Sequence, residues 1–212
     1  MKLFSLPLDR SVYSIDSMKT PDAKERLIQA MTDALQRRGL HGSGLTELLA
    51  AANAPKGVLY HHFPGGKTEL AVAAVNATTA RLCSMFDTRI ASGDPVSALM
   101  AWVDGAQKRL AASGYEEGCP LATIALETTQ VDVEIRAALA DGFARIRSRI
   151  GAALVRAGYA ERSAASLAAL IVAAYEGGLL QARAAGTPEP MKLVGEALQC
   201  LLVLHRPPGE LA

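Results

Sequence analysis

Residues 56–63 of this 212-residue chain carry donor groups suited to nucleic acid. Lys56 and Tyr60 are four residues apart, so a helix would place them on one face, with His61 on a neighbouring one. An ammonium, a phenol and an imidazole all donate hydrogen bonds, which suits phosphate oxygens and base edges. Gly57 has no side chain, so a phosphate or base can approach its backbone closely. This pattern predicts a helix face that contacts DNA.

The elements around this face form a helix-turn-helix pattern. Leu59 and Phe63 are also four residues apart and are expected to face the core. A short helix over residues 47–52, which begins at Thr46, precedes them, and residues 53–55 form a tight break. In such a unit the second helix enters the major groove and the first crosses the backbone.

Two further residues are expected to bind phosphate. Lys67 stands at the start of the next long helix, where the positive helix end already attracts anions. Thr46 offers a hydroxyl at the start of the helix before the turn. The alternative for any one of these polar residues is an ordinary solvated helix surface.

No metal or cofactor site is expected. Adjacent residues on a helix point about 100° apart, so His61 and His62 do not chelate one ion together. The sequence has no HExxH motif, and Cys83, Cys119 and Cys200 are too far apart for a CxxC or zinc pattern. We interpret the three cysteines as buried or free thiols in a reducing compartment.

The chain as a whole predicts an all-α fold of about nine helices. Half of its residues are hydrophobic but only 5% are aromatic, and alanine and leucine recur throughout. No strand-length alternation with hairpin turns is present. We expect an N-terminal extension (1–18), a three-helix DNA-binding domain (19–66) and a larger helical ligand-binding and dimerisation domain (67–212). The expected helices are 22–38, 47–52, 56–63, 67–90, 95–112, 121–129, 131–157, 160–185 and 189–204.

Two helices have specific boundary or face patterns. The start of the first helix is predicted at residues 20–22, with Thr20 as the cap, Pro21 in the first turn and Asp22 as an acid near the positive helix end. A buried stripe is expected farther along at spacings of three and four, formed by Val131, Ile135, Leu139, Phe143, Ile146, Ile150 and Leu154.

Charge and hydropathy point to a cytoplasmic protein. The formal net charge is +1, which excludes a globally basic coat but not a local basic face. The first residues lack a signal-peptide pattern, and the longest uncharged apolar run, 163–175, is too short to span a bilayer. We therefore expect no membrane partner.

The stretch 46–63 followed by Lys67-Thr68-Glu69-Leu70 resembles the signature of the TetR family of repressors, with about ten positions in register. The sequence departs from that signature at Pro55, where a small cap residue is usual, and at 64–66, which is longer than the common linker. This longer linker, together with 118–121 and 125–127, resembles the LmrA/QacR-like subgroup.

The resemblance implies a role for each matching residue. Thr46, Lys56, Tyr60 and Lys67 would contact phosphates, whereas Gly57, Val58, His61 and His62 would lie at or near base edges. It also implies a homodimer on palindromic double-stranded DNA that a small, apolar or amphipathic effector releases.

The second half of the chain would supply the dimer and the sensor. The expected interface residues are Leu167, Ile171, Ala174, Gly178, Leu193, Ala197 and Leu201. The expected ligand-binding residues are Met100, Trp102, Thr123, Glu127, Phe143, Tyr175 and Glu176, with Gln107 and Gln181 as further polar candidates. The alternative for both sets is internal core.

Three other functions compete with a ligand-released repressor. An activator or a ligand-independent regulator would use the same scaffold, and no sequence feature separates them. An all-helical enzyme would need a nucleophile–base pair or a metal cluster, and neither pattern is found, so the chain is expected not to be an enzyme. A helical ligand carrier would lack DNA binding altogether.

Overall fold

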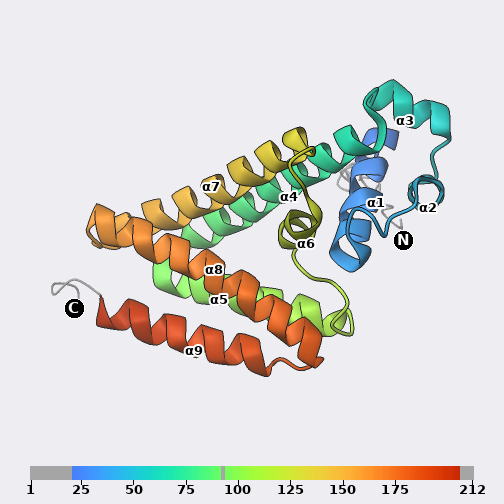
Figure 1. Ribbon diagram of the computed structural model, residues 1–212. Coiled ribbons are helices and arrows are strands. Elements are labelled where there is room, and N and C mark those ends of the chain that lie inside the picture. Colours follow the sequence, from blue (N-terminus) through green and yellow to red (C-terminus); the bar gives the residue numbers. More distant parts are fainter. Residues whose placement is uncertain (1–20, 92–93, 206–212) are drawn as a thin grey trace, which may run out of the picture.

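The computed structural model describes residues 21–91 and 94–205, and within these ranges all regular structure is helical (Figure 1). The all-α prediction is therefore confirmed. The helices are α1 (Ala23–Arg38), α2 (Leu45–Ala51), α3 (Lys56–His62), α4 (Gly66–Ala91), α5 (Pro95–Ala112), α6 (Pro120–Glu127), α7 (Val133–Arg156), α8 (Glu161–Ala185) and α9 (Glu189–Leu204).

The first two helices begin at other residues than the sequence predicted. The cap of α1 is Asp22, whose carboxylate accepts a hydrogen bond from Glu25 N at 2.8 Å, while Glu25 Oε2 accepts from Asp22 N at 3.2 Å. This reciprocal capping box satisfies two backbone donors, and Thr20 lies outside the described residues. Gly44 caps α2, so Thr46 lies inside its first turn.

The start of α7 corrects the predicted apolar stripe. Val131 is 86% exposed and precedes the helix, because Thr129 N and its hydroxyl both donate to Asp132 Oδ2 and close a turn there. The rest of the stripe behaves as predicted. Ile135, Leu139, Ile146, Ile150 and Leu154 are buried, and Phe143 is half-buried.

Helices α1–α3 form a small unit at one end of the molecule, and α4 leads from it into the larger helical body (Figure 1). Within that body α4 lies against α7, α7 against α8, and α8 against α9, while α6 packs beside α1. A single apolar cluster runs through both parts, from Leu27 and Leu59 in the small unit to Ile171 and Leu202 in the body. The position of the small unit therefore depends on packing against the larger one.

Helix α8 is the most apolar long helix. Among the described residues it alone is long and apolar enough to cross a membrane, with a mean hydropathy of 1.5 over its best window. Nearly half of that window is buried inside the chain, which is also the property of a core helix.

Gly142 sets the separation of α4 and α7. A Cβ at this position would lie 2.6 Å from Thr79 Oγ1 and 3.3 Å from Leu121 Cδ2, and Thr79 is fully buried. We expect Gly142→Ala to lower the free energy of unfolding by roughly 1–3 kcal/mol because it overpacks this contact. The measurement is urea unfolding followed by circular dichroism.

Gly105→Ala is the matched control, since a Cβ there meets nothing closer than 3.5 Å. It is expected to leave stability unchanged or to raise it by up to about 1 kcal/mol, from helix propensity. Equal stability of the two variants would contradict the close α4–α7 contact.

Candidate functional site

Helix α3 is anchored on one side and open to solvent on the other. Leu59 and Phe63 are 0% and 2% exposed, which confirms that they face the core. Lys56, Gly57 and Tyr60 lie on the exposed side. A helix fixed by two large buried side chains presents its outer residues in a defined orientation.

The Tyr60 ring is held in place by its neighbours. Gly66 has a φ of +66°, and a Cβ there would lie 3.3 Å from Tyr60 Cε1, so the ring packs against bare backbone. On the other side, Lys56 Nζ lies 5.9 Å from the ring centroid. Gly57 has open space around the position of a Cβ, so a ligand can approach its backbone.

The remaining residues predicted to meet DNA lie around this face. His61 on α3 and Thr46 on α2 are exposed, while Val58 and His62 are half-buried. The rings of His61 and His62 are 4.9 Å apart and meet edge to face. Hydrogen-bond donors from α2 and α3 are thus exposed on the surface of the small unit.

Arg26 of α1 holds the turn between α2 and α3, and the sequence reasoning did not identify it. Its Nε donates to Ala52 O at 2.9 Å, and a second nitrogen reaches Asn53 O at 3.5 Å. Asn53 has a φ of +46°, a conformation that asparagine tolerates better than most residues. A half-buried arginine 26 positions upstream gives no local sequence pattern, so only the fold reveals this contact.

Lys67 requires a correction. Its ammonium donates to Leu40 O at 2.6 Å, in the loop after α1, and the side chain is half-buried. Burial lowers the pKa of Lys67, and the nearby Glu127 carboxylate opposes that effect. Lys67 therefore joins α4 to the α1–α2 loop, and we do not assign it to phosphate.

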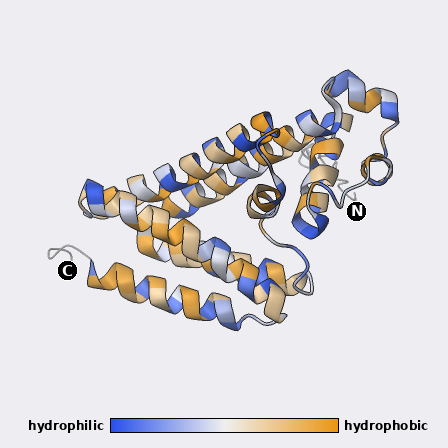
Figure 2. Cartoon of the chain, viewed as in Figure 1, coloured by the Kyte–Doolittle hydropathy of each residue, from blue (hydrophilic) through white to orange (hydrophobic). Residues whose placement is uncertain are grey.

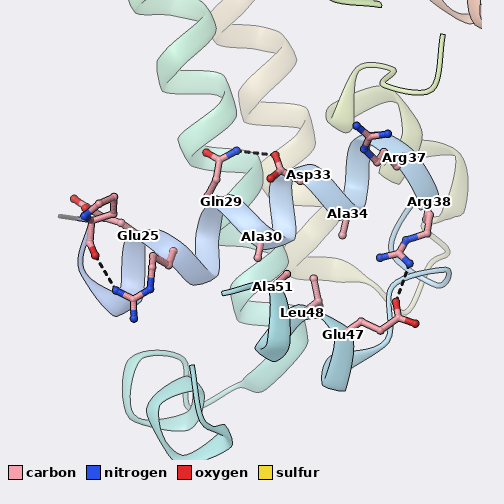
Figure 3. Close-up of a pocket in the computed structure, with 12 residues that line it drawn as sticks. Glu25, Gln29, Ala30, Asp33, Ala34, Arg37, Arg38, Glu47, Leu48 and Ala51 are labelled. Carbon is pink, nitrogen blue, oxygen red and sulfur yellow. Dashed lines mark hydrogen bonds and ion pairs between the residues drawn. The ribbon is translucent and has the colours of Figure 1, made fainter. Parts of the chain in front are cut away.

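A groove of about 460 Å³ lies between α1 and α2, and its polar rim is internally paired (Figure 3). Gln29 donates to Asp33 at 2.7 Å, and Arg38 pairs with Glu47 at 2.8 Å. The helices come together here at small residues such as Ala30. Because its polar residues are paired with one another, we interpret this groove as a feature of the packing between α1 and α2 and not as a ligand site.

A larger cavity of about 760 Å³ opens between α6, α7 and α8. Four residues expected to bind ligand line it, namely Thr123, Glu127, Phe143 and Glu176. Cys119 and Arg183 also line it and were not among the expected ligand-binding residues. The wall is mostly apolar with a few polar groups, as ligand sites commonly are.

The other expected ligand residues lie elsewhere. Trp102 and Tyr175 are buried and stack on each other, with ring centroids 3.9 Å apart and planes at 15°. Met100 is half-buried against the same core. These three residues, and also Gln107 and Gln181, do not line the 760 Å³ cavity, and their assignment to a ligand stays a prediction.

The cavity is joined to the small unit by polar contacts with residues 36–41, which we call the 36–41 segment. Arg183 donates to Gln36 O at 3.2 Å and to Arg37 O at 2.7 Å, and Gly118 N donates to Gln36 O at 3.1 Å. Arg183 lies in the wall of the cavity, so its guanidinium links that wall to the end of α1.

Glu127 makes a second link of the same kind. Its Oε2 accepts a hydrogen bond from His41 N at 2.9 Å. Gly39 has a φ of +73°, and a Cβ there would fall 1.6 Å from Glu127 Oε1, so only glycine fits beside this carboxylate. Glu127 therefore positions the 36–41 segment while it lines the cavity.

The outer faces of α8 and α9 carry an unpartnered apolar surface, and α9 is largely hydrophobic in Figure 2. Of the expected interface residues, Leu193 and Ala197 are exposed, and Ala174 and Leu201 are half-buried. Leu167, Ile171 and Gly178 lie inside the chain's own core, so their assignment to the interface is corrected. The exposed apolar residues here are Leu170, Leu193, Val203 and Leu204.

Comparisons with known proteins match both parts of the chain. Residues 27–74 match the family described as bacterial regulatory proteins, tetR family, and residues 95–197 match the LmrA/YxaF-like transcriptional regulator C-terminal domain. The chain is 29% identical over 186 residues to the HTH-type transcriptional regulator LmrA of Bacillus subtilis, covering 87% of this chain and 99% of that protein. It is 28% identical over 182 residues to YxaF of the same organism, covering 85% and 95%.

Solved structures agree in fold. The regulatory protein TetR from Rhodobacter sphaeroides superposes with a TM-score of 0.77 at 25% identity, over 84% of this chain and 97% of that one. A TetR transcriptional regulator from Legionella pneumophila gives a TM-score of 0.78 at 23% identity, over 87% and 99%.

Arg26→Met tests whether the turn between α2 and α3 depends on α1. The variant keeps the apolar stem but loses the donors to Ala52 O and Asn53 O, so the free energy of unfolding should fall by roughly 1–3 kcal/mol. Hydrogen exchange should also accelerate most at 52–54.

Arg38→Met is the control, because its pair with Glu47 is exposed and should be worth no more than about 1 kcal/mol. If both variants lose the same stability and protection, Arg26 does not organise the turn.

Proposed function

This chain belongs to the TetR family of bacterial transcriptional regulators, and we propose that it represses transcription by binding a palindromic operator as a homodimer. We further propose that a small effector in the cavity between α6, α7 and α8 releases it from DNA. The observation that carries the proposal is the anchored α3, whose exposed face presents Lys56, Gly57, Tyr60 and His61.

Helix α3 would enter the major groove, with α2 across the backbone. Thr46, Lys56 and Tyr60 would contact phosphates, which fix the register on the duplex without reading sequence. Gly57, Val58, His61 and His62 would lie at or near base edges, where the open space at Gly57 permits close approach. Lys67 has no part in this proposal because it binds Leu40 O.

Two copies would join through α8 and α9. Both helices carry exposed apolar residues, and exposed small residues such as Ala169 and Ala173 on α8 would let a partner helix approach closely. Larger apolar patches of this kind mark interaction sites. A two-fold dimer would place two α3 helices at successive major grooves, roughly 34–36 Å apart.

Effector release would work through the 36–41 segment. Arg183 and Glu127 line the cavity and also hold this segment. A ligand that favours another position of either side chain would shift the small unit relative to the body, and with it the spacing of the two α3 helices. This double role favours a ligand-responsive regulator over a ligand-independent one.

An activator would use the same contacts, and a reporter gene under the operator distinguishes an activator from a repressor. We place this activity in the cytoplasm.

Lys56→Met tests the DNA-binding face. We expect weaker binding to the operator found by genomic footprinting, similar across operator variants, because a phosphate contact carries no base information. The slope of log K against log salt should fall by about 0.9 for each α3 in the complex. Fluorescence anisotropy over a salt series measures both.

Lys108→Met makes the same chemical change on α5, where Lys108 pairs with Asp104 at the surface. Its affinity and salt slope should match those of the wild type. An unchanged slope in Lys56→Met would argue against a phosphate contact, and absence of any footprinted site would argue against the function itself.

Leu193→Glu tests the dimer surface. Leu193 is 57% exposed on α9, and a buried carboxylate at a two-fold contact is costly, so the variant should shift from dimer to monomer. Sedimentation equilibrium measures this shift. Val133→Glu places the same charge on an exposed residue at the start of α7 and should stay dimeric. Wild-type protein that is monomeric would contradict the proposal.

A further inference from the structure

The cavity between α6, α7 and α8 has an apolar wall with one distinctive polar group. Ala122, Leu126, Phe143 and Leu179 supply much of its lining, and its volume of about 760 Å³ suits a drug-sized molecule. Glu176 of α8 also lines it. The chemistry of this carboxyl group indicates what kind of ligand the cavity accepts.

Glu176 has an unused acceptor. Its Oε2 is buried, and among the described residues it has no hydrogen-bond partner, while the Cys119 thiol hydrogen-bonds to the carboxyl group. Burial raises the pKa of Glu176 to about 7, and the Cys119 hydrogen bond opposes that effect. A buried carboxylate without a full set of donors is costly, so a donor brought by a ligand would be stabilising.

The other charged residues of the wall are already engaged. Arg183 donates to Gln36 O and Arg37 O, and Glu127 accepts from His41 N. The neighbouring Tyr175 is buried, its hydroxyl hydrogen-bonds with Arg109 of α5, and burial raises its pKa well above the usual value. Within the described part of the chain, the lining therefore offers no cation that pairs with Glu176.

Cys119 acts here as a donor and not as a nucleophile. Burial, together with the adjacent Glu176 carboxylate, raises the pKa of its thiol well above the usual value. Reactive cysteines need the opposite environment, one that stabilises the thiolate. This chemistry disfavours covalent capture of a ligand and favours reversible polar recognition.

We propose that the cavity binds an apolar molecule carrying a protonated amine, whose ammonium donates to the unpartnered carboxylate oxygen of Glu176. The proposal rests on the function proposed above, because it gives the chemical class of the effector. An ammonium supplies three donors and a compensating charge, and charge-assisted hydrogen bonds are about twice as strong as neutral ones. The apolar part of the ligand would lie against Leu126 and Phe143.

The pairing has a defined pH dependence. An alkylammonium stays protonated up to about pH 10, whereas Glu176 ionises near 7. Binding needs the carboxylate, so affinity for an amine should rise between pH 6 and pH 8. A neutral ligand of the same shape should show no such rise, which separates this effect from titration elsewhere in the protein.

The test uses three fluorescent probes with one common body. Dansylcadaverine carries a primary ammonium on a five-carbon chain, N-pentyldansylamide has the same chain without the amine, and N-dansyl-6-aminohexanoic acid ends in a carboxylate. Fluorescence titration of the full chain at pH 8 should show dansylcadaverine binding at least about tenfold tighter than the other two. Equal or tighter binding of the neutral or acidic probe would overturn the proposal.

Variants locate the contact. Glu176→Gln should remove the preference for the amine and its pH dependence, whereas Glu134→Gln, on the exposed side of α7, should leave both unchanged. Leu126→Trp, at a 78% exposed position of the lining, should weaken all three probes. If Glu176→Gln fails to fold, the comparison of the three probes and the pH series on the wild type still test whether the cavity prefers an amine. A preference that survives Glu176→Gln would refute the assignment.

Operator binding, followed in the presence of each probe, separates the two proposals. Tight amine binding that leaves the operator complex intact would support the site but contradict release by an effector. Release by the neutral probe without any amine preference would support the function and overturn the ligand class.

Discussion

The 36–41 segment, at the end of α1, is the point on which the position of the small unit depends. Gly118 N and Arg183 hold its carbonyls, Glu127 holds His41 N, and Lys67 donates to Leu40 O. Each contact satisfies a backbone N–H or C=O group at or just beyond the end of α1. The loop before α6 and the helices α4, α6 and α8 supply these contacts. In the mechanism proposed above, a change in the larger body would therefore reach α1 and, through it, α3.

The proposed DNA-binding face is supported from its inner side by packing and hydrogen bonds. Leu59 and Phe63 fix α3 in the core, Arg26 closes the turn before it, and Gly66 supports the ring of Tyr60. Preorganised side chains lose less conformational entropy when they bind. In the proposed release mechanism, the small unit would therefore keep the arrangement of its donors if the 36–41 segment shifted.

Helix α8 combines three roles along one length. Its inner face is core, through residues such as Ile171, and its outer face is the apolar surface proposed for the dimer. Between them, Glu176 and Arg183 line the cavity, and Arg183 reaches α1. A ligand beside α8 would thus act on a helix that holds the small unit and, in the proposed dimer, also contributes to the interface, which would couple the two sites.

The sequence alone determined the helices and the outward face of α3, because these follow from local periodicity: Leu59 and Phe63 repeat at the helical spacing of a buried face. It could not determine which partner a polar or apolar side chain would meet. Lys67 was expected to bind phosphate but donates to a backbone carbonyl, and Trp102 stacks on Tyr175 in the core and does not line the 760 Å³ cavity. The contacts of Arg26 and Arg183 span 26 and about 147 positions, so only the tertiary packing of distant helices could decide them.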